Sequence, residues 1–413
     1  MIYRKTKYDW IGDIPADWNL AKIGSLFNIG RGRVIAASEI DENTGDYPVY
    51  SSQTKNDGCM GYIDTFDYDC EQITWTTDGA YAGSVFYRTG KHNCTNVCGT
   101  LQLANSKKAY LKYCYYALQY IAPYYKRRDT NGYKIMNNEM ADIVITLPPK
   151  NMQIQISKYL DRRMKYVDKL IIDLERQAEM LEIYRRELIA NVVTKGLNRV
   201  SSMKNSGVDW MGDVPEHWNV TKLKWSFEIV KRIYGAEDRD VLSITQRGIK
   251  VKDIDSNDGQ LAESYTNYQV VNVNDFAMNS MDLLTGWVDC SPYEGVTSPD
   301  YRVFRFHPDK PQCHTYYKYL FQMCYTNRIF YRLGQGVSNF GRWRLQADQF
   351  LNIRLPQPPI EEQEQIAAYL DKKVGQIEEL TADIKAQIEK LKEYRKIVIH
   401  DAVTGKIKVT EGE

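Results

Sequence analysis

Two basic and aromatic segments of this chain carry side chains suited to contacting DNA. Residues 107–134 hold seven lysines and arginines against one acid, and residues 301–354 hold nine against two. Cationic side chains contact phosphates, whereas Arg, Asn, Gln and Ser also reach base edges. Each segment contains a polar, basic loop. The candidate DNA-contacting residues in these two loops are Arg127, Arg128, Asn131, Lys134, Gln335, Ser338, Asn339, Arg342 and Arg344.

A further basic turn, Gly30-Arg31-Gly32-Arg33, adds Arg31 and Arg33 to the DNA-contacting candidates. The turn is too short to be a glycine-rich phosphate-binding fingerprint. The segment that follows it, residues 36–78, holds ten acids and one lysine, a net charge of −9. Acidic and basic residues are therefore concentrated in separate segments of the chain. Tyrosines at helical spacing in the basic segments, such as Tyr113 and Tyr116, are expected in the core.

No catalytic motif accompanies these segments. The sequence has no Gly-x4-Gly-Lys-Ser/Thr phosphate-binding loop and no Asn/Asp-Pro-Pro-Tyr/Phe methyl-transfer motif. His92, Cys94 and Cys98 lack a fourth ligand at a usual zinc spacing, so these cysteines are interpreted as small buried thiols. The sequence predicts a non-catalytic chain with no metal and no cofactor of its own.

Length and composition limit the elements that position these residues. A chain of 413 residues predicts two or three domains, and 43% apolar with 26% charged residues excludes a largely disordered protein. A net charge of +1 excludes a uniformly basic coat protein. The sequence lacks an apolar run of 18 residues and a signal-peptide pattern, and its eight cysteines are typical of reduced thiols, so a cytoplasmic location is expected.

The chain repeats itself once. Residues 9–19, DWIGDIPADWN, match residues 209–219, DWMGDVPEHWN, at an offset of 200 residues. A second match, at an offset of 210, pairs residues 155–163 with 365–373. Two matches in the same order indicate a duplicated unit. The segments between them, 20–146 and 220–354, look unrelated in sequence.

Each half ends in a long helix with coiled-coil periodicity. Apolar residues alternate at spacings of four and three through about 155–194 and 365–404. Residues 160–192 would form about 50 Å of helix. The two seams can bury each other as an antiparallel intramolecular pair with pseudo-two-fold symmetry; homodimerisation through each helix is the alternative. Ten seam positions are Leu160, Val167, Leu174, Leu181, Leu188, Leu370, Ile377, Ile384, Leu391 and Val398.

The segments that precede the helices mix strands and helices. Residues 72–76 and 303–306 are β-rich and lie among Gly, Asn and Asp turns, whereas 109–122 and about 315–333 are expected to be helical. The predicted fold class is therefore α+β. Two mixed domains are separated by two long helices.

This arrangement resembles the specificity subunit of Type I restriction–modification enzymes. The resemblance covers nearly the whole chain and rests on the duplicated tryptophan openings, the two heptad helices and the proline-rich helix starts at 147–149 and 355–363. The first helix start departs from the family pattern because it lacks the Glu-Gln pair. Segments 78–83 and 295–301 also resemble recurrent parts of the family's target-recognition domains.

The resemblance implies a division of labour along the chain. Target-recognition domains are expected at 1–150 and 199–357, coiled-coil helices at 151–198 and 358–405, and a tail at 406–413. Each domain would read one half of a bipartite DNA target, and the acidic segment would lie away from DNA, at a subunit contact. The helices would set the gap and dock two methyltransferase subunits, which recruit restriction subunits. S-adenosylmethionine, ATP and Mg would bind those partners, in a bacterial or archaeal cell.

Two other classes of function remain as alternatives. A self-contained nuclease would require a metal-binding catalytic motif, and the sequence shows no acidic pair followed by Glu-x-Lys that marks one. A coiled-coil scaffold without DNA binding accounts for the long helices but not for the two basic segments.

Overall fold

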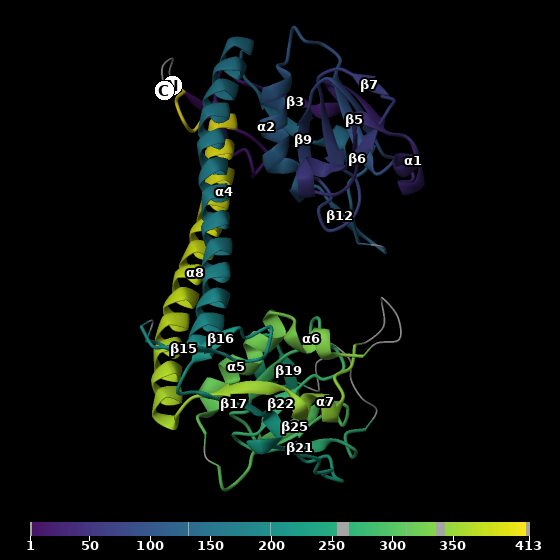
Figure 1. Cartoon of the computed structure of the whole chain (residues 1–413). Coiled ribbons are helices and arrows are strands. Elements are labelled where there is room, and N and C mark those ends of the chain that lie inside the picture. Colours follow the sequence, from purple (N-terminus) through teal and green to yellow (C-terminus); the bar gives the residue numbers. More distant parts are fainter. Residues whose placement is uncertain are drawn as a thin grey trace. The chain divides into compact units, whose positions relative to one another are not determined.

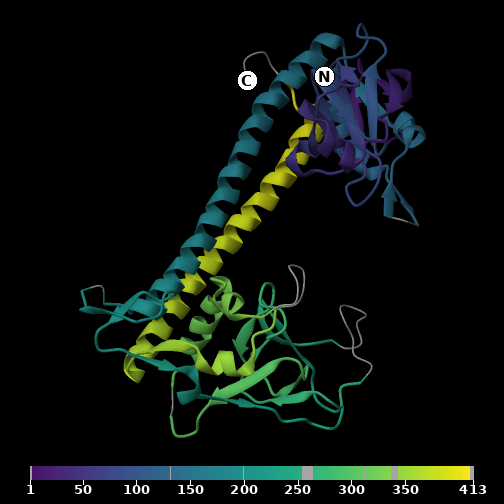
Figure 2. The same cartoon turned by 45° about the vertical axis from the view of Figure 1, so that its right-hand side comes forward.

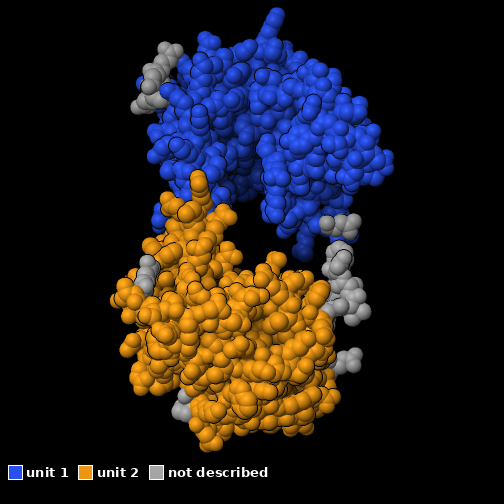
Figure 3. Space-filling model, in the orientation of Figure 1, with its two compact units in different colours: residues 1–175, 385–413 blue, residues 176–384 orange. Residues whose placement is uncertain are grey.

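The computed structural model of the chain describes residues 2–130, 132–198, 200–253, 264–310, 312–335 and 343–409. Two compact units form, unit 1 from residues 1–175 with 385–413 and unit 2 from residues 176–384 (Figure 3). The helices α4 (Lys150–Lys195) and α8 (Ile360–Val403) each continue from one unit into the other without a break (Figures 1 and 2). Within the described ranges, no helix is both long and apolar enough to span a bilayer.

The same antiparallel four-stranded sheet forms in both units, although their sequences look unrelated. Its order in unit 1 is β4 (Phe27–Arg31), β11 (Cys98–Leu103), β8 (Gln72–Thr76), β9 (Val85–Arg88). Its order in unit 2 is β18 (Phe227–Val230), β25 (Arg302–Phe306), β22 (Phe276–Met278), β23 (Val288–Cys290). The helices α2 (Leu111–Ile121) and α5 (His314–Thr326) contribute buried tyrosines to the respective cores. The predicted fold class is thereby confirmed as a mixture of helices and strands in both units.

The remaining strands differ between the units. In unit 1 the acidic segment supplies α1 (Ala37–Glu42) and most of a second sheet, ordered β6 (Cys59–Ile63), β5 (Thr44–Tyr50), β10 (Lys91–Cys94), β7 (Tyr68–Asp69). Unit 2 instead has two strand pairs, β19 (Leu242–Thr245) with β20 (Gly248–Val251) and β21 (Gln269–Val271) with β24 (Gly295–Thr297). The units thus share one sheet and differ in the other.

The repeated sequence motifs lie next to each other within each unit. The tryptophan openings form the hairpins β1 (Tyr3–Lys5) with β2 (Asp13–Pro15) and β15 (Met203–Asn205) with β16 (Asp213–Pro215). The strand after each opening pairs with the strand before each long helix, namely β3 (Asn19–Lys22) with β14 (Val144–Leu147) and β17 (Asn219–Lys222) with β26 (Arg354–Gln357). A backbone hydrogen bond ends each ladder, from Ile23 N–H to the Ile143 carbonyl and from Leu223 N–H to the Ile353 carbonyl.

Each unit buries the start of one long helix together with the end of the other. The core of unit 1 includes Leu160 of α4 and Val403 of α8, and that of unit 2 includes Leu370 of α8 and Val193 of α4. A buried tyrosine hydroxyl in each unit donates to a carbonyl of the last helical turn: Tyr113 to Val403 at 3.0 Å and Tyr316 to Val193 at 2.9 Å. These carbonyls have no partner within their helix, so the tyrosines cap the helix ends.

The expected helix at 315–333 is two helices. The helix α5 ends at Thr326, Arg328 adopts a left-handed conformation with φ +57°, and α6 (Ile329–Leu333) follows. No glycine or proline marks this break in the sequence. The long helices begin at Lys150 and Ile360, directly after proline pairs and about five residues before the periodic pattern indicated. Short helices α3 (Asn137–Asp142) and α7 (Ala347–Asn352) precede β14 and β26.

Replacing Tyr316 with Phe is expected to destabilise unit 2 by about 1–3 kcal/mol. The substitution removes the hydroxyl and leaves the Val193 carbonyl buried without its partner. Urea unfolding followed by circular dichroism measures the change. The control is Tyr293→Phe, an exposed tyrosine of the same unit, which should shift the unfolding free energy by no more than about 0.5 kcal/mol. Equal effects of the two variants would contradict the capping role.

Candidate nucleic-acid interface

The first basic loop is a β-hairpin made of β12 (Arg127–Asp129) and β13 (Gly132–Lys134). In this register Arg127 lies opposite Lys134 and Arg128 lies opposite Tyr133. The loop expected from the sequence is therefore an ordered hairpin in its described residues. Asn131, at its tip, lies outside the described residues.

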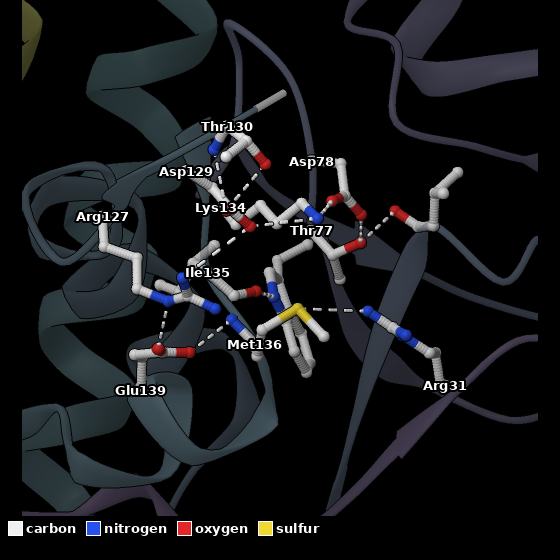
Figure 4. A network of polar contacts seen from close by, with 12 residues as sticks. Arg31, Thr77, Asp78, Arg127, Asp129, Thr130, Lys134, Ile135, Met136 and Glu139 are labelled. Carbon is white, nitrogen blue, oxygen red and sulfur yellow. Dashed lines mark hydrogen bonds and ion pairs between the residues drawn. The ribbon is translucent and has the colours of Figure 1, made fainter. Parts of the chain in front are cut away.

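Carboxylates hold two of the hairpin's three cations (Figure 4). Arg127 Nε lies 2.8 Å from Glu139 Oε1, and its Nη1 lies 3.8 Å from Asp129 Oδ2. Lys134 Nζ lies 3.1 Å from Asp129 Oδ2 and 3.7 Å from Asp78 Oδ1. Two cations and three carboxylates are thus joined in one network.

Hydrogen bonds fix the carboxylates in turn. Asp129 accepts the backbone N–H of Thr130 at 2.8 Å, and this bond together with Lys134 lowers the pKa of the Asp129 carboxyl. The second oxygen of Glu139 accepts the N–H of Met136 at 2.7 Å, at the start of α3. Asp78 Oδ2 accepts the Thr77 hydroxyl at 2.6 Å. The positions of the cations are therefore set by anchored acids.

The other cationic candidates of unit 1 fall into two groups. Arg128 is exposed and forms no ion pair with any residue that the structure describes. Arg31, at the end of β4, is also exposed, and its Nη2 lies 3.4 Å from Met136 Sδ beside the network (Figure 4). Arg33 is instead held by Glu39 at 2.6 Å and Asp67 at 3.1 Å, in the acidic segment. The structure thus brings Arg31 to the hairpin and ties Arg33 elsewhere.

The hairpin packs on the loop between β8 and β9. Gly79 N–H donates to the Tyr133 carbonyl, and Ile135 N–H donates to the Thr77 carbonyl, each at 2.9 Å. Tyr81 in the same loop is 61% exposed. The hairpin and this loop, which includes the segment 78–83 singled out above, therefore form one continuous surface of unit 1.

The second basic loop occupies the matching place in unit 2. Gln335 and Arg344 exchange backbone hydrogen bonds of 2.9 and 3.0 Å, and Leu345 N–H donates to the Ser280 carbonyl at 3.1 Å. Ser280 thus corresponds to Thr77 of unit 1. Gln335 and Arg344 are exposed, and the ring of Trp343 lies 5.0 Å from that of Tyr331. Three candidates, Ser338, Asn339 and Arg342, lie outside the described residues.

The sequence reasoning missed the acids of this site. Asp78, Asp129 and Glu139 hold the candidate cations, yet Asp78 was counted only in the acidic segment expected away from DNA, and Glu139 in no charged segment. A signal for Glu139 existed, since an acid three residues after a helix cap typically accepts the cap's N–H. The loop that matches residues 77–83 in unit 2 is 280–286, whereas the segment 295–301 consists of β24 and the turn that leads to β25.

The ten seam positions of the two long helices are all at least half-buried. Leu160, Val167, Leu370, Ile377, Ile384 and Val398 are buried, whereas Leu174, Leu181, Leu188 and Leu391 are half-buried. Other protein groups therefore cover at least part of each of these ten side chains.

The ring of His92 contacts protein groups, and the two cysteines near it are free thiols. The two ring nitrogens of His92 lie 2.7 Å from Gln72 Nε2 and 2.8 Å from the Gly90 carbonyl. Cys94 and Cys98 are buried free thiols, as interpreted above. In the described part of the chain no three His, Cys, Asp or Glu side chains are grouped as a metal site.

Comparison with known proteins identifies the family to which this chain is similar. The model of the Type I restriction modification DNA specificity domain matches the chain twice, over residues 15–182 and 216–390. The chain belongs to this family. The resemblance inferred from the duplicated motifs is thereby confirmed, as is the prediction of a DNA sequence-specificity subunit that is not itself an enzyme.

Relatives of this specificity subunit occur in bacteria and archaea. A putative type I specificity subunit N-terminus of Mycoplasma pneumoniae is 44% identical over 140 residues, 34% of this chain and 74% of that relative. Alignments with two further M. pneumoniae specificity subunits span 56% and 59% of those proteins. The MjaVIII specificity subunit of Methanocaldococcus jannaschii is 25% identical over 96% of this chain and 94% of its own length.

A solved structure of a type I restriction–modification system contains a chain with the same fold. Its TM-score is 0.67 at 13% identity, and the alignment covers 95% of this specificity subunit and 99% of that chain. At so low an identity the similarity concerns the fold alone.

Proposed function

We propose that this subunit reads a bipartite DNA sequence, with one half-site bound by each unit. The observation that carries the proposal is the matching place of the two basic loops. In both units a residue just after the loop donates its backbone N–H to a carbonyl of the turn that joins the third and fourth strands of the shared sheet. Two readers of the same topology and different loop sequence would recognise two different half-sites.

The proposal includes an antiparallel intramolecular coiled coil of α4 and α8, with pseudo-two-fold symmetry. Two ion pairs support it, Asp168–Arg395 in unit 1 at 3.3 Å and Arg185–Glu378 in unit 2 at 3.6 Å. Asp168 corresponds to Glu378, and Arg185 to Arg395, at the repeat offset of 210 residues. Seventeen residues separate the two pairs along both helices, so one antiparallel register satisfies both.

The coiled coil would hold the recognition domains, 1–150 and 199–357, at a fixed separation. Its helices, 151–198 and 358–405, would also dock two methyltransferase subunits, with restriction subunits beyond them. Exposed apolar side chains on α4 support a docking role, since Ile172, Met180 and Tyr184 are 62%, 60% and 52% exposed. S-adenosylmethionine, ATP and Mg would act on those partners, because the specificity family itself is not a family of cofactor-binding enzymes.

Alanine substitution of the candidate cations tests DNA contact directly. A phosphate-contacting residue should weaken binding to all sequences and lower the slope of log affinity against log salt by roughly one. A base-reading arginine should cost about 1–3 kcal/mol and relax the choice at one position. We expect at least one of Arg342 and Arg344 to be a base-reading arginine. The measurement is binding of the complex with methyltransferase to duplex DNA at two salt concentrations, together with sequencing of methylated sites.

The five variants to compare are those of Arg127, Arg128, Lys134, Arg342 and Arg344. If affinity, salt slope and methylated sequence stayed unchanged in all five, the DNA-contacting surface would lie elsewhere. A scaffold without DNA binding would also show no salt-dependent gel shift in the presence of its partner. A self-contained nuclease would cleave DNA as an isolated chain with a divalent metal.

A further inference from the structure

We infer that the hairpin of unit 1 reads bases with cations that carboxylates hold in place, and that Asp129 is the positioning residue of this site. In unit 2 the matching cation, Arg344, forms no ion pair with any residue that the structure describes. The inference rests on the proposed function, since it assumes that both basic loops contact DNA. It adds a difference in recognition chemistry between the two halves.

Asp129 is the acid that both tethered cations share. Its Oδ2 lies 3.1 Å from Lys134 Nζ and 3.8 Å from Arg127 Nη1, while its Oδ1 accepts the Thr130 N–H. The side chain is 25% exposed, compared with 50% for Arg127 and 29% for Lys134. A cation bound in this way keeps one orientation, as recognition of a base edge requires, and it has little freedom to follow a phosphate.

At the matching positions that the structure describes, unit 2 has no carboxylate in these places. The backbone pairing of the two loops aligns Lys134 with Arg344 and Arg127 with Gln335. The repeat offset aligns Glu139 with Gln349, and the matching turns align Asp78 with Met281. Two carboxylates are thus replaced by neutral side chains. Arg344 is exposed and forms no ion pair with any residue in the described ranges.

The two arrangements differ in their electrostatics toward DNA. Binding to phosphates releases counterions, so a cation that is free before binding gives a steep salt dependence. A cation already neutralised by a carboxylate contributes less to that slope, and the carboxylate repels nearby phosphates. The tethered cations of unit 1 should therefore add discrimination at their half-site and contribute little to the salt dependence of binding.

The test is Asp129→Asn in the full chain, bound to its methyltransferase partner. The variant removes one negative charge and releases Lys134 and Arg127 from their shared partner. Two DNA duplexes are used, one with the target found by sequencing methylated DNA and one with the half-site of unit 1 scrambled. We expect affinity for the scrambled duplex to rise several-fold and discrimination between the duplexes to fall about tenfold. The salt slope should steepen by about one, because Lys134 loses its nearest carboxylate while Arg127 keeps Glu139 at 2.8 Å.

A merely structural role of Asp129 predicts a different result. If the acid only supports the hairpin, Asp129→Asn weakens binding to both duplexes in equal proportion, and this outcome overturns the inference. Unchanged discrimination overturns it as well. Asp129→Glu keeps the charge and should restore most of the discrimination. Thermal unfolding of each variant, compared with the parent, identifies any loss of fold, and Lys134→Gln then tests the same site from the cation's side by lowering discrimination.

A matched control separates the tether from a general effect of charge. Asp142 pairs with the exposed Lys22 at 2.7 Å in the same unit, outside the hairpin network. Asp142→Asn also releases one lysine, and it should leave discrimination unchanged. If Arg128→Ala and Lys134→Gln both left DNA binding intact, the proposed DNA contact of unit 1 would itself fail. If they weakened binding while Asp129→Asn failed to raise non-specific affinity, only this inference would fall.

Discussion

Inserting one heptad into each long helix is expected to widen the gap in the DNA target by about three base pairs. Seven helical residues add about 10.5 Å, and one base pair of duplex rises about 3.4 Å. The insertions belong after Glu175 in α4 and after Gln387 in α8, which the register of the two ion pairs places opposite each other. Sequencing of methylated sites measures the new gap, while the bases of both half-sites should stay the same.

Insertion into one helix alone is the matched control. It places apolar seam residues out of register and should abolish methylation of both the old and the widened target. An unchanged gap in the double insertion would contradict the proposed spacer. A gap that changed together with the half-site bases would show that the helices affect reading as well as distance.

Exchange of one recognition domain is expected to change one half of the methylated sequence and to leave the other half intact. The structure supplies matched junctions, because residues 23–143 and 223–353 are each bounded by the backbone hydrogen bond that ends the two-stranded ladder. Joining there preserves the ladder, the tryptophan opening and the helix start. The donor segment should come from another specificity subunit with a known target.

The two reciprocal exchanges control each other. Replacing 23–143 should alter one half-site, and replacing 223–353 should alter the other, as read by sequencing of methylated DNA. If either exchange changed both halves, the two units would not read independently. Loss of all methylation, with the chimaera folded and bound to its partner, would place a required DNA contact outside the exchanged segments.

Much of the fold could be predicted because its signals are local or periodic. The heptads predicted α4 and α8, the strand at 72–76 was found at those residues, and the helix at 109–122 was found as α2. The shared sheet could not be predicted in the same way. Strand order depends on contacts between residues far apart in sequence, and the two units fill the same topology with different side chains.

The candidate site could be predicted only in part for a related reason. Local charge pointed to Arg127, Arg128 and Lys134, but the acids that hold two of them come from other elements. Asp78 lies some fifty residues earlier, in the turn after β8, and Glu139 lies in α3. Arg33 shows the same limit, since its sequence neighbours did not indicate that folding would place it between the carboxylates of Glu39 and Asp67.

The burial of both helix ends in each core has a consequence for the order in which the chain folds during synthesis. Unit 1 needs Val398, Ile399, Ala402 and Val403, which leave the ribosome more than 200 residues after its own β-strands. Unit 2 lies entirely within residues 176–384 and is fully synthesised before them. Domains that emerge first generally fold first. In this chain the later unit can complete its core first, and the earlier one must wait for the last turns of α8.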